Sequence, residues 1–165
     1  MSDLFNLTGK AAIVTGASSG LGRQFALALA RQGADVAILA RRLEKLEAVK
    51  AEIEKYGVKC LAVKCDVLDN EDIKKAVAEV KGAFGKIDIL INNAGIGLFA
   101  PAEEQTDEMW RKMIDMNLSS VYFVAREVGK VMIEQKYGKI VNTGSIHSTV
   151  AMTGLPLNAY CTTKG

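Results

Sequence analysis

The sequence predicts an α/β fold in which helices cover both faces of an open, doubly wound parallel sheet. Five short runs rich in Val, Ile and Leu alternate along the chain with segments of helical periodicity. The runs are continuously apolar, which is typical of strands covered on both faces. Strands that alternate with helices are joined by right-handed crossovers and therefore lie parallel in one sheet.

The predicted strands are 11–15, 36–40, 60–63, 88–92 and 139–143. Two of the intervening segments carry apolar stripes at helical spacing. One comprises Leu43, Leu46, Val49 and Ile53, and the other Ile73, Val77 and Val80.

The longest helical candidate spans 107–136, and Thr106 or Asp107 is placed to cap it. We expect Trp110 on this helix to pack against the rest of the domain. Met113 and Met116 share a helix face with Met109 and are expected in the core or at an interface.

Composition limits the function classes that remain. The 165 residues are 49% hydrophobic and 24% charged, which predicts one folded domain with a sizeable core. The net charge of +2 argues against a nucleic-acid or membrane-surface partner. The N-terminal segment lacks the pattern of a secretory signal, and no apolar run has the length of a membrane span.

The chain has few residues that could bind a metal or form disulfides. Its three cysteines, Cys60, Cys65 and Cys161, have no paired CxxC spacing, which argues against a disulfide framework. A single histidine, His147, with scattered cysteines cannot complete a metal coordination set. We therefore expect no metal and a reduced, cytoplasmic setting.

A glycine-rich turn, residues 15–22 with the sequence TGASSGLG, follows the first predicted strand and precedes a helical segment. Backbone N–H groups and the positive end of a helix dipole at such a turn bind anions. Gly16 permits a tight turn, Gly20 lets the backbone approach a pyrophosphate, and Gly22 allows helix and strand to pack closely. Three glycines alone can also be mere turn punctuation, but the flanking strand and helix favour a dinucleotide site.

The residues after the second predicted strand indicate which nucleotide is bound. A carboxylate at this point binds the ribose hydroxyls of NAD, whereas arginine suits a 2′-phosphate. The chain has Arg41 and Arg42 here and no carboxylate, which favours NADP(H) over NAD(H). The alternative interpretation is that both arginines simply begin a surface helix.

Tyr160 and Lys164 are four residues apart, so on a helix they share a face. A nearby ammonium stabilises a phenolate and lowers a pKa that starts near ~10, which makes a tyrosine usable as a general acid or base. Such a pair also occurs by chance in many helices. Ser145 follows the fifth predicted strand, at the end where ligands bind in such sheets.

Together these residues resemble the short-chain dehydrogenase/reductase superfamily, and the resemblance covers essentially the whole chain. It is similar to the NADP-preferring, cytosolic bacterial type, which includes 3-oxoacyl-carrier-protein reductases and gluconate 5-dehydrogenases. The motifs that carry it, in order, are TGASSGLG, Cys65-Asp66-Val67, Asn92-Asn93-Ala94-Gly95, Asn117, Ser145 and Tyr160-x-x-x-Lys164.

The resemblance implies a Rossmann fold of strand order 3-2-1-4-5 and a homo-oligomer, either a dimer or a tetramer. It also implies an enzyme that interconverts a secondary alcohol and a ketone, with NADP(H) as the cofactor. The turn residues implied to hold the dinucleotide are Gly16, Ser18, Ser19, Gly20, Leu21 and Gly22. Arg41 and Arg42 would take the 2′-phosphate, Asp66 and Val67 the adenine, and Asn93, Ala94 and Gly95 the ribose region.

The resemblance also implies catalytic roles. Tyr160 would exchange a proton with the substrate oxygen, while Lys164 binds the nicotinamide ribose and lowers the pKa of Tyr160. Ser145 would hold the substrate oxygen, and Asn117 would anchor a water that links Lys164 to solvent.

The chain departs from the family pattern at two points. Ser145 lies fifteen residues before Tyr160, a wider gap than usual, so Ser148 at twelve residues is an alternative. Ser145 is preferred because it follows the strand directly; the loop between it and Tyr160 is then enlarged. The chain also stops one residue after Lys164, so residues 1–165 are expected to form a single, C-terminally incomplete dinucleotide-binding domain with a poorly ordered end.

Two other function classes remain open at this point. The chain can be a nucleotide-binding sensor or inactive fragment, although such a protein is free to lose the tyrosine, lysine and serine that are all present here. It can also be a structural piece that oligomerises through an open sheet edge. The remaining pocket candidates are Leu98, Phe99 and the loop 149–158, and His147 is either a substrate contact or a loop residue.

Overall fold

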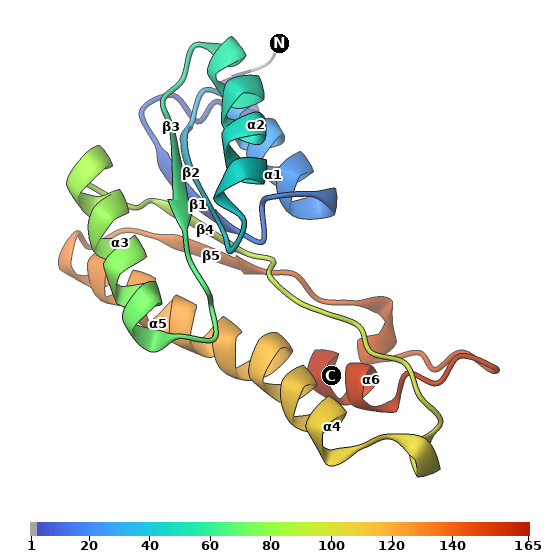
Figure 1. The fold of residues 1–165 in the computed structure, drawn as a ribbon. Coiled ribbons are helices and arrows are strands. Elements are labelled where there is room, and N and C mark those ends of the chain that lie inside the picture. The colour runs from blue at the N-terminus through green and yellow to red at the C-terminus, as the bar shows by residue number, and fades with distance from the viewer. Residues whose placement is uncertain (1–2) are drawn as a thin grey trace.

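The computed structural model describes residues 3–165 and confirms the predicted sheet. Its five strands lie in the order β3-β2-β1-β4-β5, and every neighbouring pair is parallel (Figure 1). The strands are β1 (Ala11–Thr15), β2 (Asp35–Ala40), β3 (Cys60–Lys64), β4 (Ile89–Asn92) and β5 (Lys139–Asn142). Four of the predicted runs differ from these bounds by one residue. Residues 1 and 2 lie outside the described range. They belong to the N-terminal segment that lacks the pattern of a secretory signal.

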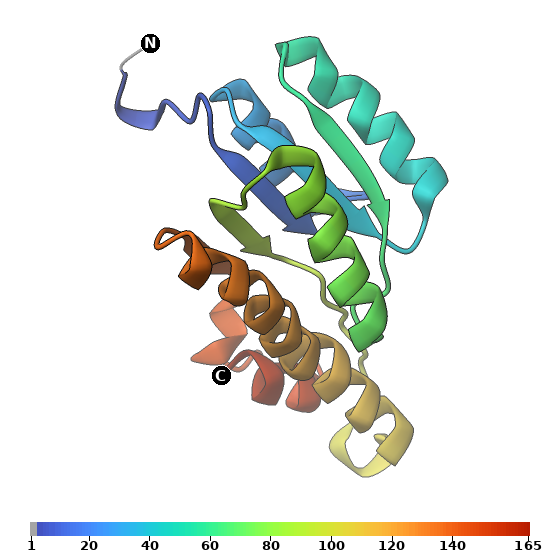
Figure 2. The same ribbon diagram turned by 90° about the vertical axis from the view of Figure 1, so that its left-hand side faces the viewer.

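Helices cover the sheet on both faces. The helices are α1 (Gly20–Arg31), α2 (Leu43–Ile53), α3 (Asn70–Phe84), α4 (Asp107–Ile114), α5 (Ser120–Glu134) and α6 (Asn158–Lys164). Helices α1 and α2 pack on one face, and α3 and α5 lie side by side on the other (Figures 1 and 2). The short helix α6 packs against α4, beyond the ends of the strands (Figure 1).

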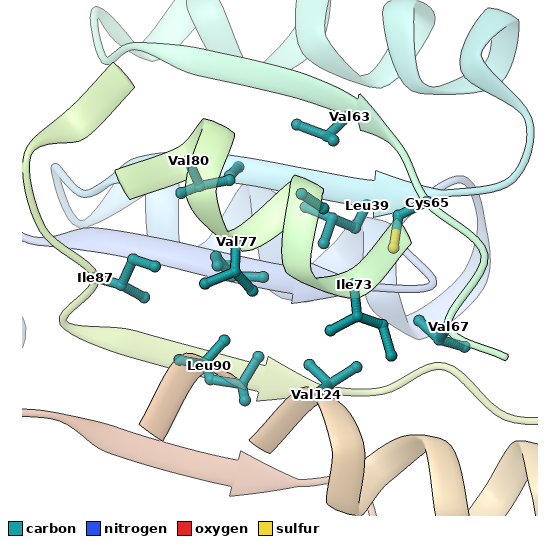
Figure 3. Packing of buried hydrophobic residues seen from close by; sticks show 14 of the residues in the cluster. Leu39, Val63, Cys65, Val67, Ile73, Val77, Val80, Ile87, Leu90 and Val124 are labelled. Atoms are coloured by element: carbon teal, nitrogen blue, oxygen red, sulfur yellow. The ribbon is translucent and has the colours of Figure 1, made fainter. Parts of the chain in front are cut away.

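The hydrophobic core is divided by the sheet into two clusters, because successive strand residues point to opposite faces. In β1, Val14 joins the cluster beneath α1 and α2, and Ile13 joins the one beneath α3 and α5. In the second cluster, Val77 and Leu90 pack between helix α3 and the sheet (Figure 3). Full burial of each such side chain contributes roughly 1.5–3 kcal/mol to stability.

The expectation that every strand is covered on both faces is wrong for β5. All four of its residues are exposed, including Ile140 at 41% and Val141 at 51%. The strand is at the edge of the sheet, where within residues 3–165 it pairs only with β4. Continuous apolar character therefore does not distinguish this edge strand from the buried ones.

The long helical candidate is confirmed as one helical region with an irregular centre. Helix α4 is capped by Thr106, whose Oγ1 accepts a hydrogen bond from the Met109 N–H at 3.2 Å. A π-helical segment, Asp115–Ser119, joins α4 to α5. Met113 is fully buried, but Trp110 is 41% exposed, so the expectation that it packs inward is not met.

Leu43 also lies outside the core, in contrast to the other members of its predicted stripe. It is the first residue of α2 and is 41% exposed, whereas Leu46, Val49 and Ile53 are buried. The helix reaches the sheet only after its first turn, so a stripe at helical spacing can begin before the contact does.

Candidate active site

The segments that follow all five strands meet at the carboxyl edge of the sheet, where they line two adjoining pockets. The larger pocket has a volume of about 550 Å³ and the smaller one about 200 Å³. Gly95 and Ile96, just after β4, line both. The two pockets are therefore neighbours across one loop.

The smaller pocket brings together residues that are far apart in the sequence. Those predicted to bind the cofactor are Gly16, Ser18, Ser19, Arg41, Arg42, Asp66, Val67, Ala94 and Gly95. Sequence reasoning did not assign the other lining residues, which are Leu39, Ala40, Cys65, Ile96 and Met116. Arg41 and Arg42 are exposed at the pocket, and Arg42 is also the N-cap residue of α2, so the pair begins a surface helix and lines the pocket as well.

The glycine-rich turn has the geometry of an anion site. Gly16 and Gly20 have φ values of 65° and 55°, in the left-handed region that favours glycine. A Cβ on Gly22 would overlap the Gly16 carbonyl, so Gly22 serves close packing, whereas nothing among the described residues lies within 4 Å of a Cβ at Gly20. Helix α1 begins here without a side-chain cap bond from Ser19 within residues 3–165. Its first N–H groups therefore remain available to a phosphate.

Thr15, which the sequence reasoning treated only as the end of a strand, holds the turn against β4. Its buried Oγ1 accepts hydrogen bonds from the N–H groups of Asn93 and Ala94, both at 3.0 Å. The Asn93 side-chain amide donates to the Thr15 carbonyl at 3.1 Å. These bonds fix the spacing between the turn and the loop after β4, and hence the shape of the smaller pocket. Its place at the start of the glycine motif was the only available signal.

The larger pocket contains three of the four predicted catalytic side chains, and Asn117 is not among its lining residues. Ser145, Tyr160 and Lys164 line it together with Asn93 and Leu21. The Ser148 hydroxyl instead donates to the Ser145 carbonyl at 2.7 Å. Ser145 lines the larger pocket, and Ser148 is not among its lining residues. The other lining residues are Gly95, Ile96, Gly97, Phe99, Thr143, Gly144, His147, Leu155 and Leu157.

Tyr160 and Lys164 lie on α6, one turn apart. The Lys164 ammonium is 6.0 Å from the centre of the Tyr160 ring and donates to the Thr143 carbonyl at 2.8 Å. Burial lowers the pKa of Lys164. Ala159 and Thr163 are buried and pack α6 against the rest of the domain.

Asn117 lies in the π-helical segment and acts as a clamp between two parts of the site. Its Oδ1 accepts from the Ile96 N–H at 2.8 Å, and its Nδ2 donates to the Ile96 carbonyl at 2.9 Å. Nδ2 also donates to the Thr163 hydroxyl at 3.1 Å. The loop after β4 and helix α6 are thereby held together. The sequence marked Asn117 only through its resemblance to the family motif and gave no sign of these partners.

Within residues 3–165, no cluster of three or more His, Cys, Asp or Glu side chains is placed to hold a metal ion. None of the helices in this range combines the length and apolar character that crossing a membrane requires.

The fold and site define a Rossmann-type domain that carries a Tyr–Lys pair and a serine beside its glycine-rich turn. The family model for short chain dehydrogenases matches residues 10–165. The chain therefore belongs to the short chain dehydrogenase family, as its motifs predicted. Proteins of this family are oxidoreductases that use a nicotinamide cofactor, NAD or NADP.

Characterised relatives are similar over nearly all of this chain. It is 41% identical to the gluconate 5-dehydrogenase of Gluconobacter oxydans, covering 99% of this chain and 63% of that protein. It is 40% identical to a 2-dehydro-3-deoxy-D-gluconate 5-dehydrogenase of Pseudoalteromonas atlantica, covering 100% of this chain and 65% of the relative. The chain thus spans less than two thirds of the length of these relatives.

Solved structures agree with the fold. A short-chain type dehydrogenase/reductase from Mycobacterium marinum superposes with a TM-score of 0.95 at 35% identity, covering 99% of this chain and 68% of that one. An NAD⁺-bound xylitol dehydrogenase superposes with a TM-score of 0.91 at 37% identity. This match covers 98% of this chain and 61% of that one.

Proposed function

We propose that this chain is the dinucleotide-binding domain of an NADP(H)-dependent oxidoreductase that interconverts a secondary alcohol and a ketone. The observation that carries the proposal is the position of Tyr160, Lys164 and Ser145 in one pocket, which adjoins a second pocket lined by the glycine-rich turn. A nucleotide-binding module without catalysis has no need of this trio.

The described residues fit a nicotinamide dinucleotide. The turn leaves open space at Gly20 and unbonded N–H groups at the start of α1 for the pyrophosphate. Arg41 and Arg42 supply charge-assisted donors for a 2′-phosphate, and Asp66 with Val67 supplies a polar and an apolar contact for the adenine. When bound, the nicotinamide supplies or accepts the hydride.

The side chains in the larger pocket manage the proton. In the oxidation direction the alcohol carbon loses a hydride while its hydroxyl proton passes to Tyr160, and reduction reverses both transfers. Lys164 places a positive charge 6.0 Å from the centre of the Tyr160 ring. Ser145 donates a hydrogen bond to the substrate oxygen, and Asn117 holds α6 so that Tyr160 keeps its position.

The substrate is proposed to be a small molecule with a secondary hydroxyl or a ketone group. Relatives are named for gluconate, sorbose and D-threitol, but also for a 3β-hydroxysteroid. We further propose a cytoplasmic homo-oligomer. The cytoplasm suits three free cysteines, and exposed apolar residues such as Tyr122 and Val141 suit an interface between copies.

A fluorescence titration of the purified chain with NADPH and, in parallel, NADH tests the proposal first. We expect NADPH to bind at least about tenfold more tightly, because its extra phosphate meets two guanidinium groups. Assays with ketones and NADPH then test turnover. Tighter binding of NADH would contradict the cofactor assignment, and binding of neither would contradict the function proposed for this chain.

A further inference from the structure

His147 is the only histidine in the chain, and the chemistry proposed above does not use it. It lies on the short turn after β5 and lines the larger pocket together with Ser145 and Tyr160. Its ring meets the Tyr160 ring edge to face, with 6.2 Å between the ring centres. His147 therefore lies beside the group that exchanges the proton with the substrate.

The hydrogen bonding of this ring assigns its tautomer. His147 Nδ1 is 3.0 Å from the Val150 carbonyl oxygen. A carbonyl oxygen can only accept, so Nδ1 carries the hydrogen, and in the neutral ring Nε2 is an acceptor. Within residues 3–165 no hydrogen bond to Nε2 is made, so the enlarged loop orients the ring and leaves one nitrogen for a ligand.

The nearby hydroxyl groups on the same loop are already engaged. Ser148 Oγ donates to the Ser145 carbonyl at 2.7 Å, and Thr149 Oγ1 donates to the Ile146 carbonyl at 3.3 Å. The neighbouring wall of the pocket is apolar, with Phe99, Leu155 and Leu157 among its lining residues. His147 is consequently the polar side chain of this loop that is placed to recognise a substrate.

We propose that His147 Nε2 accepts a hydrogen bond from a hydroxyl on the carbon next to the reacting one, so that the site selects polyols and their hydroxyketones over simple alcohols. This inference rests on the proposed function, because Tyr160 places the reacting oxygen. The His147 and Tyr160 rings meet edge to face. A substrate whose reacting oxygen lies at Tyr160 therefore brings a hydroxyl on the next carbon toward the His147 ring. A monohydric alcohol offers Nε2 no donor at this position and therefore forgoes the hydrogen bond that a vicinal diol makes.

Two variants separate substrate recognition from loop positioning. His147→Asn keeps an amide donor near the position of Nδ1 for the Val150 carbonyl but removes the group at Nε2. His147→Gln reaches the position of Nε2 with an acceptor oxygen but does not reproduce the Nδ1 bond. The substrates are threitol and 2-butanol, which both have four carbons and a secondary hydroxyl but differ in neighbouring hydroxyls. Both are oxidised with NADP⁺ as the hydride acceptor.

We expect His147→Asn to lower kcat/KM for threitol roughly fivefold to tenfold and to leave that for 2-butanol unchanged, the effect of one lost neutral hydrogen bond. His147→Gln should retain most of the threitol activity. The opposite ranking, with His147→Gln impaired on both substrates and His147→Asn normal, would assign His147 to the loop alone and overturn the proposal. Turnover of neither alcohol by the wild-type chain contradicts the proposed function instead.

A binding measurement tests the contact without turnover. Because His147 is the only histidine, its ring Cε1–H signal in a ¹H–¹³C NMR spectrum needs no assignment. We expect threitol to shift this signal in a saturable manner in the presence of NADP⁺, and 2-butanol to shift it much less. Equal shifts with both alcohols, or none with threitol, would overturn the proposal.

Discussion

At the scale of single residues, the proposed function depends most on Tyr160 and Lys164, which both line the larger pocket. In the proposed reaction the phenol gives and takes a proton, and the Lys164 ammonium lies 6.0 Å from the centre of its ring. A phenyl ring at this position fills the same space but cannot transfer a proton.

We therefore expect Tyr160→Phe to lower kcat by about 10²–10⁴-fold while the Kd for NADPH changes little. Steady-state kinetics and the fluorescence titration measure the two quantities separately. Tyr137→Phe, at an exposed tyrosine just before the amino end of β5, is the matched control and should leave both unchanged. Comparable turnover by Tyr160→Phe and the wild-type chain would rule out a proton-transfer role for Tyr160.

Arg41 and Arg42 carry the prediction of cofactor preference. Replacing both by alanine removes two guanidinium groups from the smaller pocket and should raise the Kd for NADPH roughly tenfold or more. The Kd for NADH should stay the same because NADH lacks the 2′-phosphate. Lys45→Ala on the exposed side of α2 controls for a general loss of positive charge. Equal weakening of both cofactors would contradict phosphate recognition.

The buried thiols predict how stability depends on alkaline pH. Burial raises the pKa of Cys60 and of Cys65 from 9.0 to about 12. Between these values the unfolded chain loses thiol protons that the folded chain keeps, so stability is fully present below pH 9 and falls as pH rises. Urea titrations up to about pH 11 should show a steeper fall in the free energy of unfolding for the wild type than for Cys60→Ala/Cys65→Ala. Parallel pH profiles would contradict this explanation.

At the scale of secondary structure elements, the π-helical segment between α4 and α5 directs the Asn117 side chain toward the loop after β4 and α6. Such segments interrupt an α-helix and are frequent at functional sites. Here it places a buried amide where it bonds both backbone groups of Ile96 and the hydroxyl of Thr163. One side chain thus connects the loop after β4, the long helical region and α6.

We expect Asn117→Ala to lower the free energy of unfolding by about 2–4 kcal/mol, because it leaves two backbone groups of Ile96 without partners. Thr163→Val removes only one of the three partners and should cost about 1 kcal/mol. Urea unfolding followed by circular dichroism measures both. If the two variants lost equal stability, the bonds to Ile96 would not be the source of the effect.

At the scale of the whole molecule, the sheet is protected unevenly. Helices cover the inner strands β1 and β2 on both faces, but β5 exposes its whole length at one edge of the sheet. An exposed apolar edge strand is a template for pairing with another chain. The most direct consequence is association between copies.

We expect the chain to run as a dimer or larger species in light scattering, and Val141→Lys to shift it toward the monomer, since charge on an edge strand opposes pairing. Leu68→Lys, at a residue that is similarly exposed but precedes α3, is the control. A monomeric wild-type chain at micromolar concentration would contradict the prediction.

The sequence by itself determined the sheet and the family, and the resemblance to the family implied the strand order. These features depend on apolar runs, helical spacing and short motifs. Such patterns are local in the chain and can be recognised without knowing which residues are in contact. It also placed the glycine-rich turn, Arg41 and Ser145 after strands, and the carboxyl ends of parallel strands necessarily meet at one edge. The roles of these residues toward cofactor and substrate stay predictions.

Only the tertiary structure decided how the site is held and where the core ends. The partners of Asn117 lie 21 and 46 residues away, and Thr15 bonds residues 78 and 79 positions further on, so no local spacing encodes them. Likewise, the exposure of β5 depends on what packs beside it rather than on its own apolar residues. Side-chain contacts across the sheet follow from packing of the whole chain, and this is why they could not be predicted from the pattern of residues alone.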